Sequence, residues 1–418
     1  MKHTTIHITN GRVIDPRHGV DALADVFIAN GRVAAIGQSP DGFSPTQTLD
    51  AGGCIVCPGL VDLAVRLGSV EPELSAAVAG GVTSLACPPD SRPPLDEPGL
   101  VERLVRRSEA VGLAHVYPVG ALTQQLAGER LAEMHSLAKA GCVAFSQAHK
   151  AIIDTQVLLR AMQYAATFDL AVHLQAQDYH LSRDGVAHDG EVAARLGLSG
   201  IPVCAETIAV VTALHLAQAT GVRLHLARLS SAAALELVRA ARHGGQAVTC
   251  DIGCHYLHLS ETDIGNFDSH TRLTPPLRAA SDREALRRAV AEGLAVLCSD
   301  HTPLNEDGKQ IPFDEALPGA TGVELLLPLT LRWAQEADIP LLTALARITS
   351  EPAAILGIPA GSLAVGEAAD ICIFDPEESW CVTPENLRSQ GKNIPFPGVE
   401  MKGRVKQTLI GGRLVFPC

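Results

Sequence analysis

The sequence lacks the features that would direct it to a membrane, out of the cell or onto nucleic acid. No segment resembles a signal peptide, and no apolar run resembles a membrane span. Runs of Lys and Arg are also missing, and 46 acidic against 33 basic residues give a net charge of −13. An acidic surface repels nucleic acid and anionic lipid. We therefore expect a cytoplasmic protein that binds neither.

Cysteine is present, but not in the pattern of a disulfide framework. The eleven cysteines are odd in number, scattered, and mostly within apolar runs, which is typical of buried thiols in a reducing compartment. Cys54 and Cys57 form a C-x-x-C pair, but a second pair at zinc-ribbon spacing is missing. Cys250, Cys254 and His255 lie close together in another apolar stretch. We interpret all five as core residues rather than metal ligands.

The two ends of the chain share one pattern. Residues 4–49 and 361–418 read as short alternating strands joined by Asn-Gly and Gly-Gly turns. Neither end has enough strands for a stable sheet of its own, so we expect them to combine into one small β-sandwich. The predicted composite domain covers residues 1–53 and 359–418.

Residues 54–358 show a different pattern, in which apolar strand-like runs alternate with helical periodicity. After a first buried strand ending near Leu63, the strand candidates are 84–89, 114–122, 142–148, 170–177, 222–231, 247–253 and 295–303. Helix candidates include 99–112, 154–169, 205–221, 231–245 and 282–293. This alternation is typical of a parallel sheet, and about eight strands in roughly 300 residues predict a (β/α)8 barrel. With 418 residues and 47% hydrophobic content, the chain can bury such a core.

Active sites of such barrels lie on the loops that follow the strands, so each strand end was read for metal ligands. The first offers Ala64 and Arg66, of which one has no donor atom and the other is a fixed cation. The later strand ends supply Gln147, Ala148, Gln175, Gln177, Asp178, Arg228, Asp300 and His301. Among these ends, only Asp300 with the adjoining His301 keeps a plausible acid.

Several blocks of the sequence occur in an order that resembles a known family. They are PGLVDLAVRL, SLACPPDSRP, AFSQAHK, QAQD, HLARLSSAAALELVRAARHGG, RLTPPLR, SDHTP, ALPGATGVE and KNIPFPG. The first resembles the signature PGLIDLHVHLR of the dihydroorotase branch of the amidohydrolase superfamily, and the similarity runs nearly end to end. The resemblance implies an amidohydrolase-type barrel. It does not by itself imply activity, because function depends on sites rather than on folds.

The metal and substrate positions that the resemblance implies are mostly substituted. The paired histidine ligands correspond to Ala64 and Arg66, the ligating carboxylate to Gln147 or Ala148, and the next two histidines to Gln175 and Arg228. The substrate anchors correspond to Gly68, Asp90, Thr274 and Leu304. Only the catalytic aspartate, which in the family carries the proton to and from the metal-bound water, has its counterpart, in Asp300.

We infer that the inherited zinc chemistry is lost and that the chain holds no cofactor. The reaction needs a metal to lower the pKa of water from near 16 to about 7. At about 4 Å and an effective dielectric constant near 20, each arginine at a ligand position would repel a dication by roughly 8 kcal/mol. Asp300 is then vestigial. We expect it to form a buried ion pair with Arg66 or Arg228 in the vacated cavity.

A relocated site is the alternative. Its candidates near strand ends are His173, His255, His258, His301 and Asp178, which can also be ordinary polar residues of a former active-site mouth. We interpret Lys150, Lys309 and the cluster Arg103, Arg106 and Arg107 as solvated surface residues.

Three functions follow from this pattern. The substitutions resemble those of the non-catalytic pseudo-dihydroorotase subunit that, in some bacteria, assembles with the catalytic chain of aspartate carbamoyltransferase. This resemblance implies a structural subunit of pyrimidine biosynthesis, and we expect a homodimer within a larger hetero-oligomer. The alternatives are an active cyclic amidohydrolase with an altered metal site, and a ligand-sensing module that kept the pocket without the chemistry.

Overall fold

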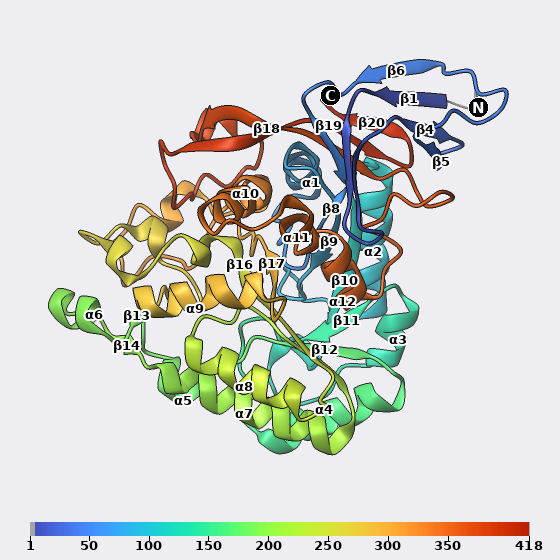
Figure 1. Cartoon of the computed structure of the whole chain (residues 1–418). Coiled ribbons are helices and arrows are strands. Elements are labelled where there is room, and N and C mark those ends of the chain that lie inside the picture. Colours follow the sequence, from blue (N-terminus) through green and yellow to red (C-terminus); the bar gives the residue numbers. More distant parts are fainter. Residues whose placement is uncertain (1–4, 418) are drawn as a thin grey trace.

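The computed structural model describes residues 5–417, so residues 1–4 of the predicted N-terminal sheet and Cys418 lie outside it. Its centre is a parallel sheet of eight strands curved into a barrel (Figure 1). In sheet order these are β8 (Leu60–Asp62), β9 (Val82–Cys87), β10 (His115–Ala121), β11 (Ala144–Ser146), β12 (Ala171–Leu174), β15 (Arg223–Leu226), β16 (Val248–Gly253) and β17 (Val296–Cys298). The predicted (β/α)8 barrel is confirmed, and each predicted strand contains or overlaps an observed one.

Helices surround this sheet (Figure 1). They are α1 (Val70–Ala79), α2 (Pro98–Val111), α3 (Met134–Lys139), α4 (Thr155–Thr167), α5 (Tyr179–Ser182), α6 (Glu191–Leu196), α7 (Val203–Thr220), α8 (Ala232–His243), α9 (Ala280–Ala291), α10 (Leu326–Glu336), α11 (Leu341–Ala346) and α12 (Ser350–Leu356). Short 3-10 turns cover 124–126, 254–257, 261–264, 269–271, 306–308, 323–325 and 384–386. A two-stranded excursion, β13 (Ala187–His188) and β14 (Gly200–Ile201), lies between α5 and α7.

The barrel closes just beyond the ends of its first and last strands. Val65 and His301 form an isolated parallel bridge, in which His301 N donates to Ala64 O at 2.9 Å and Arg66 N donates to His301 O at 3.0 Å. The buried carboxyl of Asp62 joins the same two ends, because its Oδ1 accepts from Ala64 N and Ser299 N. Closure therefore fixes the backbone at the first two positions of the predicted site.

The two chain ends form two sheets, as predicted. The first contains β5 (Arg32–Ile36), β4 (Val26–Ala29), β1 (Thr5–Thr9) and β6 (Gln47–Asp50) in that order. The second contains β20 (Arg413–Phe416), β19 (Glu400–Ile410), β18 (Ile371–Cys381), β7 (Ile55–Pro58), β2 (Arg12–Asp15) and β3 (Val20–Leu23). Their shared core joins residues from both ends, including Ile8, Val26, Leu363 and Ile371. β7 follows the predicted boundary at residue 53 but pairs with β2 and β18 rather than with a barrel strand.

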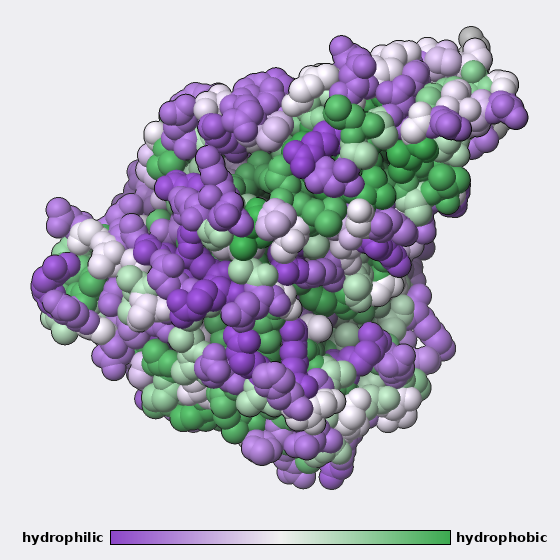
Figure 2. Space-filling view, in the orientation of Figure 1, coloured by the Kyte–Doolittle hydropathy of each residue, from purple (hydrophilic) through white to green (hydrophobic). Residues whose placement is uncertain are grey.

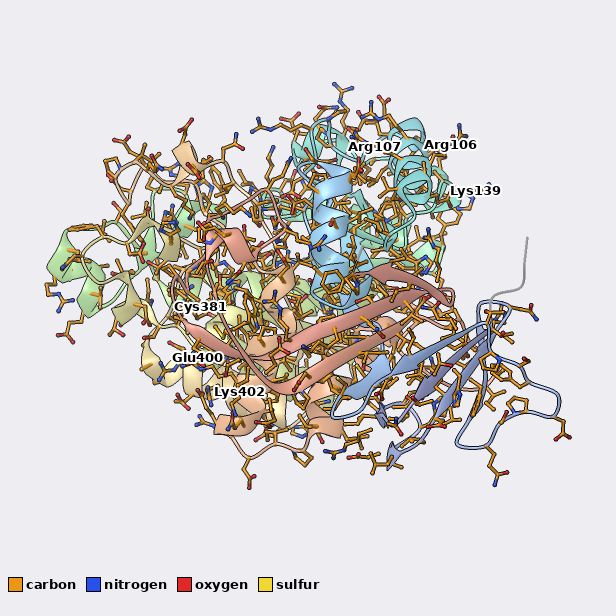
Figure 3. All side chains as sticks on the ribbon, turned by 90° about the horizontal axis from the view of Figure 1, so that it is seen from above. Arg106, Arg107, Lys139, Cys381, Glu400 and Lys402 are labelled. Carbon is orange, nitrogen blue, oxygen red and sulfur yellow. The ribbon has the colours of Figure 1, made fainter. Side chains whose placement is uncertain are left out.

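The small domain is attached to the barrel by a long ribbon. Strands β18 and β19 extend from the sandwich across the barrel, with Cys381, Glu400 and Lys402 at the far end (Figure 3). In the same view Arg106 and Arg107 project from α2 and Lys139 from α3, away from the core. The basic residues of α2 are exposed, as predicted.

Two expectations have clear outcomes, the burial of the cysteines and the exposure of Lys309. Seven of the ten described cysteines are buried free thiols, whereas Cys204 and Cys381 are exposed. Lys309 was expected on the surface, but it is 4% exposed. This prediction is wrong because the Lys309 ammonium donates to the carbonyls of Ser269 and Arg272, at 2.9 and 3.0 Å, which replace water as its partners.

Candidate functional site at the barrel mouth

Three residues at strand ends adopt a left-handed backbone. Ala148 follows β11 with φ 52°, Arg228 follows β15 with φ 53°, and Asp300 follows β17 with φ 45°. Non-glycine residues rarely adopt this conformation, and such positions cluster at functional sites. Three strand ends at the mouth therefore carry backbone of the kind that clusters at functional sites.

Arg66 lies at the centre of the mouth and contacts both acids there. Its Nε donates to Oδ2 of Asp90 at 2.9 Å, and its Nη1 lies 3.3 Å from Oδ1 of Asp300 and 3.0 Å from Thr302 Oγ1. Burial alone would lower the pKa of Arg66, but the charges of Asp90 and Asp300 outweigh it and raise that pKa. The guanidinium is therefore a permanent cation.

Arg228 reaches the same carboxylate from the other side. Its side chain is 5% exposed, and its Nε lies 3.7 Å from Oδ1 of Asp300. Its backbone N donates to Oδ1 of Asp251 at 2.6 Å. The expected ion pair of Asp300 is confirmed, and it is made with both arginines rather than with one.

The acid at the second-strand end, Asp90, is held ionised. Its Oδ2 is also 3.1 Å from Nδ1 of His149, a residue that sequence reasoning did not single out although it directly follows Ala148. Burial would raise the pKa of Asp90, but the charge of Arg66 and the hydrogen bond from His149 outweigh it and hold that pKa well below its usual value. Asp90, Arg66, Asp300 and Arg228 thus form a network of two carboxylates and two guanidiniums, which we call the mouth ion network.

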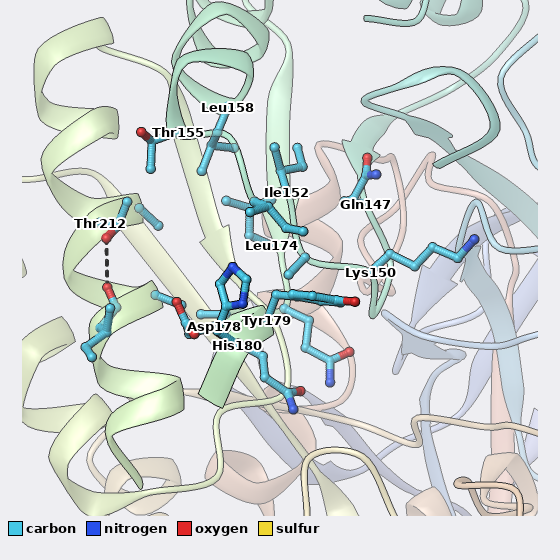
Figure 4. A pocket seen from close by; sticks show the side chains of 18 of the residues that line it. Gln147, Lys150, Ile152, Thr155, Leu158, Leu174, Asp178, Tyr179, His180 and Thr212 are labelled. Carbon is cyan, nitrogen blue, oxygen red and sulfur yellow. Dashed lines mark hydrogen bonds between the residues drawn. The ribbon is translucent and has the colours of Figure 1, made fainter. Parts of the chain in front are cut away.

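The two glutamines of the former ligand positions lie beside this network. Gln147 is buried, and its amide exchanges two hydrogen bonds with the Thr123 hydroxyl, of 3.0 and 2.8 Å. Gln175 follows β12, and its Nε2 is buried without a hydrogen-bond partner in the described part of the chain. Both glutamines line a cavity of about 120 Å³ between α4, α5 and α7 (Figure 4). Ile152, Leu158 and Leu174 form part of its apolar wall.

The remaining anchor positions are not gathered into a binding site. Gly68 is exposed, and a Cβ there would lie 3.9 Å from Pro303. The backbone N of Leu304 donates to Asn393 Oδ1 at 3.0 Å, which attaches this loop to the C-terminal segment. Thr274 is partly buried beside Pro275. Of the four anchors, only Asp90 belongs to the mouth ion network.

The histidines proposed for a relocated site are dispersed. His301 is fully buried, and its Nε2 lies 2.9 Å from Oε2 of Glu73. This contact links the segment after β17 to α1. His258 contacts the carbonyl of Leu329, and Asp178 caps α5. Within residues 5–417, no group of three or more His, Cys, Asp and Glu side chains could hold a metal ion. The residues present do not fit a zinc site.

A second buried polar cluster fills the barrel behind the mouth. The rings of His173 and His225 are 4.5 Å apart, and His225 Nε2 lies 2.9 Å from Oδ2 of Asp251. Burial would raise the pKa of Asp251, but its bond to His225 outweighs this and lowers that pKa to about 2. Burial lowers the pKa of His255 to about 4, so this imidazole is neutral at pH 7.

Charges at the mouth are paired with one another. Asp300 has both arginines as neighbours, so the carboxylate at the position of the implied proton carrier is engaged in two ion pairs. Arg66 and Arg228 would repel a dication placed between them. The ion network is not saturated, because within the described residues Asp90 Oδ1 and Arg228 Nε are buried without a hydrogen-bond partner, as is Gln175 Nε2 at the cavity.

Comparison with known proteins agrees with the fold. L-hydantoinase from Arthrobacter aurescens superposes with a TM-score of 0.87 at 25% identity, over 98% of this chain and 95% of its own. The fold is therefore that of a hydantoinase-like amidohydrolase barrel with an attached sheet domain. A dihydroorotase-like protein of Pseudomonas aeruginosa is 45% identical, and a dihydroorotase of Syntrophotalea carbinolica is 41% identical, each over 98% of this chain and 99% of its own. The family model for dihydro-orotase-like proteins matches residues 53–234. The chain belongs to the dihydroorotase-like family of the amidohydrolase superfamily.

Proposed function

We propose that the chain is a non-catalytic, cytoplasmic, dihydroorotase-like subunit that assembles with the catalytic chain of aspartate carbamoyltransferase and supports it in pyrimidine biosynthesis. The observation that carries the first half of this proposal is the position of two arginines. Arg66 and Arg228 stand at implied ligand positions, and both side chains reach Asp300. A metal-activated water would have to displace this ion network.

The electrostatics support loss of hydrolysis rather than its weakening. Removing one ligand from a metal site weakens it, and an arginine in place of a ligand offers no lone pair and adds a positive charge. Asp90 and Asp300 balance the two guanidiniums, so the network is neutral without a metal. Such a network is stable as it stands.

The partner is inferred from the resemblance to pseudo-dihydroorotase subunits. Its physical support is the intact fold, since the barrel, the sandwich and their cores are mutually consistent. When the mouth is filled by its own side chains, the outer surface is what remains available for function.

The decisive experiment mixes this chain with aspartate carbamoyltransferase from the same organism and measures mass by light scattering. We expect a defined heteromeric complex, in which transcarbamoylase activity is maintained better than in the transferase alone. Two separate peaks with unchanged activity would contradict the proposal.

An active dihydroorotase is the first alternative, and the 41% identity to a protein of that name favours it. Two measurements distinguish this alternative from the non-catalytic subunit. They are metal analysis of the purified chain and an assay of dihydroorotate hydrolysis with added zinc. We expect less than a tenth of an equivalent of tightly bound metal and no turnover above the enzyme-free rate. One equivalent of metal with turnover would replace our proposal by this alternative.

A ligand-sensing module is the second alternative, favoured by the cavity beside the mouth. The buried Nε2 of Gln175 faces no acceptor in the described chain, and a small ligand with a carbonyl or carboxylate oxygen could supply one. Titration with carbamoyl aspartate or a nucleotide, followed by thermal melting, tests this. A saturable rise in melting temperature that Gln175→Leu abolishes would support sensing.

A further inference from the structure

A small cavity lies where the β18–β19 ribbon crosses the outside of the barrel. Its volume is about 100 Å³, and its walls include Ala79 at the end of α1, Pro328 of α10 and Arg404 of β19. None of the residues that line it belongs to the mouth ion network, and none lines the cavity of Figure 4. We call it the ribbon cavity. It is separate from the former active site.

Two arginines of the C-terminal segment line the ribbon cavity, and each is stacked on an aromatic ring. The Cζ atom of Arg404 lies 4.8 Å from the centre of the Trp380 ring, and that of Arg388 lies 5.0 Å from the centre of the Phe416 ring. Stacking uses the flat face of a guanidinium and leaves free the N–H donors at its edge. The two rings therefore hold two cations in place without neutralising them.

The two guanidiniums have no carboxylate partner. Within residues 5–417, the side chains of Arg388 and Arg404 make no hydrogen bond and no ion pair. Asp375 is opposite Arg404 in the register of β18 and β19, but its Oδ1 accepts from the backbone N of Glu377 at 2.9 Å instead. Two like charges beside one cavity repel each other, so an anion between them would be stabilising.

Trp380 supplies a further donor without a partner. Its Nε1 is buried and has no hydrogen-bond acceptor in the described part of the chain. A buried indole N–H normally has a partner, and an exception calls for a water or an ion that completes it. The residue that stacks on Arg404 therefore also lacks an acceptor.

One carboxylate lines the ribbon cavity, and its oxygens are already engaged. Glu324 is 8% exposed, and it accepts from the backbone N of Arg388 at 2.9 Å and from that of Ser389 at 3.1 Å. These bonds hold the segment that carries Arg388 and leave its guanidinium unpaired. Burial raises the pKa of Glu324, so this carboxylate is charged less readily than an exposed one.

Size and donor chemistry restrict what the ribbon cavity can hold. Its volume equals that of about three water molecules, at about 30 Å³ each, which suits a small ion and not a drug-sized molecule. Guanidinium edges match the oxygens of phosphate and carboxylate. Two guanidiniums and an indole N–H offer more donors than the two oxygens of a carboxylate can use, whereas phosphate has four oxygens.

We propose that the ribbon cavity binds a phosphate-type oxyanion, through Arg388 and Arg404, with the indole N–H of Trp380 as a further donor. The anion is the free ion or the phosphoryl group of a phosphate monoester. Mostly hydrophilic residues cover the region of β18 and α10 at the upper left of Figures 1 and 2, as suits the approach of a hydrated ion. The site requires neither the transferase nor the mouth, so it holds or fails separately from the proposed function.

The first test is calorimetric titration of the full chain with sodium phosphate, against sodium chloride at the same ionic strength. We expect saturable binding of one phosphate per chain, weakened at least about tenfold in Arg388→Gln and in Arg404→Gln, since each loses charge-assisted hydrogen bonds. Arg107→Gln is the matched control, because Arg107 is exposed on α2 and does not line the cavity. It should bind phosphate as the wild type does.

Three results of that titration would overturn the proposal. They are the absence of saturable binding to the wild type, equal affinities in all three variants, and an affinity for acetate that matches the affinity for phosphate. Arg388 is exposed, so Arg388→Gln tests the site even if Arg404→Gln, within the ribbon, does not fold. Thermal melting without phosphate identifies which variants are folded.

The second test places the anion beside Trp380. The chain has two tryptophans, and Trp333 is fully buried and does not line the cavity. Phosphate should change tryptophan fluorescence with the half-saturation found by calorimetry. Trp380→Phe keeps a ring for Arg404 but has no N–H, so it should abolish this change and weaken binding about fivefold. A fluorescence change that persists in Trp380→Phe would overturn the placement of the anion.

The third test distinguishes the two sources of the anion by adding adenosine monophosphate. If this monoester displaces inorganic phosphate and binds more tightly, the ligand is a phosphate monoester whose remainder lies outside the cavity. If it does not displace inorganic phosphate, the ligand is the free ion. Binding of the monoester that neither Arg388→Gln nor Arg404→Gln weakens would overturn the monoester as a ligand of this cavity.

Discussion

Oδ1 of Asp300 lies 3.3 Å from Nη1 of Arg66, within the mouth of a barrel whose relatives include proteins named dihydroorotase. Arg228 approaches the same oxygen, at 3.7 Å. Asp300 thus contacts two guanidiniums that are 19% and 5% exposed, and Asp90 shares the pairing of Arg66. Asp300 is therefore the member of the network that links the two arginines.

Replacing Asp300 should therefore destabilise the fold. In an Asp300→Ala variant Arg66 keeps Asp90, but Arg228 loses its only acidic neighbour in the network. Removing one member of a buried pair leaves an uncompensated charge, and we expect the free energy of unfolding to fall by about 3 kcal/mol. Thermal melting and urea unfolding measure this fall.

The exposed Asp184 gives the comparison for that experiment. Asp184→Ala removes the same carboxyl group from a side chain that is 84% exposed, where an ion pair contributes little. We expect its melting temperature to match the wild type within about 1 °C, as is usual for an exposed pair. If Asp300→Ala melted at the same temperature as Asp184→Ala, the mouth ion network would have no role in the stability of the fold.

The pH dependence of stability should carry a contribution from His255. Burial lowers its pKa from 6.5 to about 4 in the folded chain. Between these values the unfolded chain binds a proton that the folded chain does not, so the contribution is fully present above pH 6.5 and is lost as pH falls toward 4. At pH 5 this loss amounts to about 2 kcal/mol.

A His255→Phe variant isolates this contribution, because it keeps a ring of similar size in place of the imidazole. We expect its stability to fall less than that of the wild type between pH 7.5 and pH 5. His243→Gln, at an exposed position on α8, should follow the wild-type curve. Parallel curves for His255→Phe and the wild type would show that His255 does not set the acid response.

Outside the mouth, Glu73 is the carboxylate whose removal we expect to lower the free energy of unfolding most. Its side chain accepts from His301 Nε2 at 2.9 Å, from Ser389 Oγ at 2.7 Å and from Gln390 N at 3.1 Å. It therefore joins α1, the closing strand end and the C-terminal segment. Burial would raise the pKa of Glu73, but its bond to His301 outweighs this and lowers that pKa.

We expect Glu73→Ala to lower the free energy of unfolding by about 3 kcal/mol, because buried His301 and Ser389 and the backbone N–H of Gln390 lose their acceptor. Urea unfolding measures the change. Glu71 lies on the same helix but is exposed, so Glu71→Ala should change stability by less than about 0.5 kcal/mol. Similar losses for both variants would mean that helix α1, rather than the carboxylate, is responsible.

The ion network was predictable from the sequence because strand order brings the strand ends together. Once the (β/α)8 barrel was assigned, the residues after β8 and β17 had to meet at closure, so Arg66 and Asp300 became neighbours. Because Arg66 and Asp300 carry opposite charges, the sequence then predicted an ion pair between them. That Arg66 would also bind Asp90 depends on side-chain reach, which strand order alone does not give.

Other features depend on contacts between distant segments. Glu73 and His301 are separated by 228 residues, and nothing near either residue indicates the other. Lys309 resembles a surface lysine because its local sequence is polar; only the fold brings the carbonyls of Ser269 and Arg272 to it.

The left-handed backbone at Ala148 allows a last prediction. Its φ of 52° is costly for any residue with a Cβ, by roughly 1–2 kcal/mol, whereas glycine adopts it freely. Ala148→Gly should therefore raise the free energy of unfolding by about 0.5 kcal/mol after the added entropy of the unfolded chain is deducted. Ala240→Gly, at an exposed position within α8, should lower it by about 1 kcal/mol. Urea unfolding of the two variants gives the comparison. Opposite signs would show that the mouth still holds backbone strain at a position whose side chain has no donor atom. Equal losses would mean that the surrounding packing, rather than the left-handed conformation, sets the cost at Ala148.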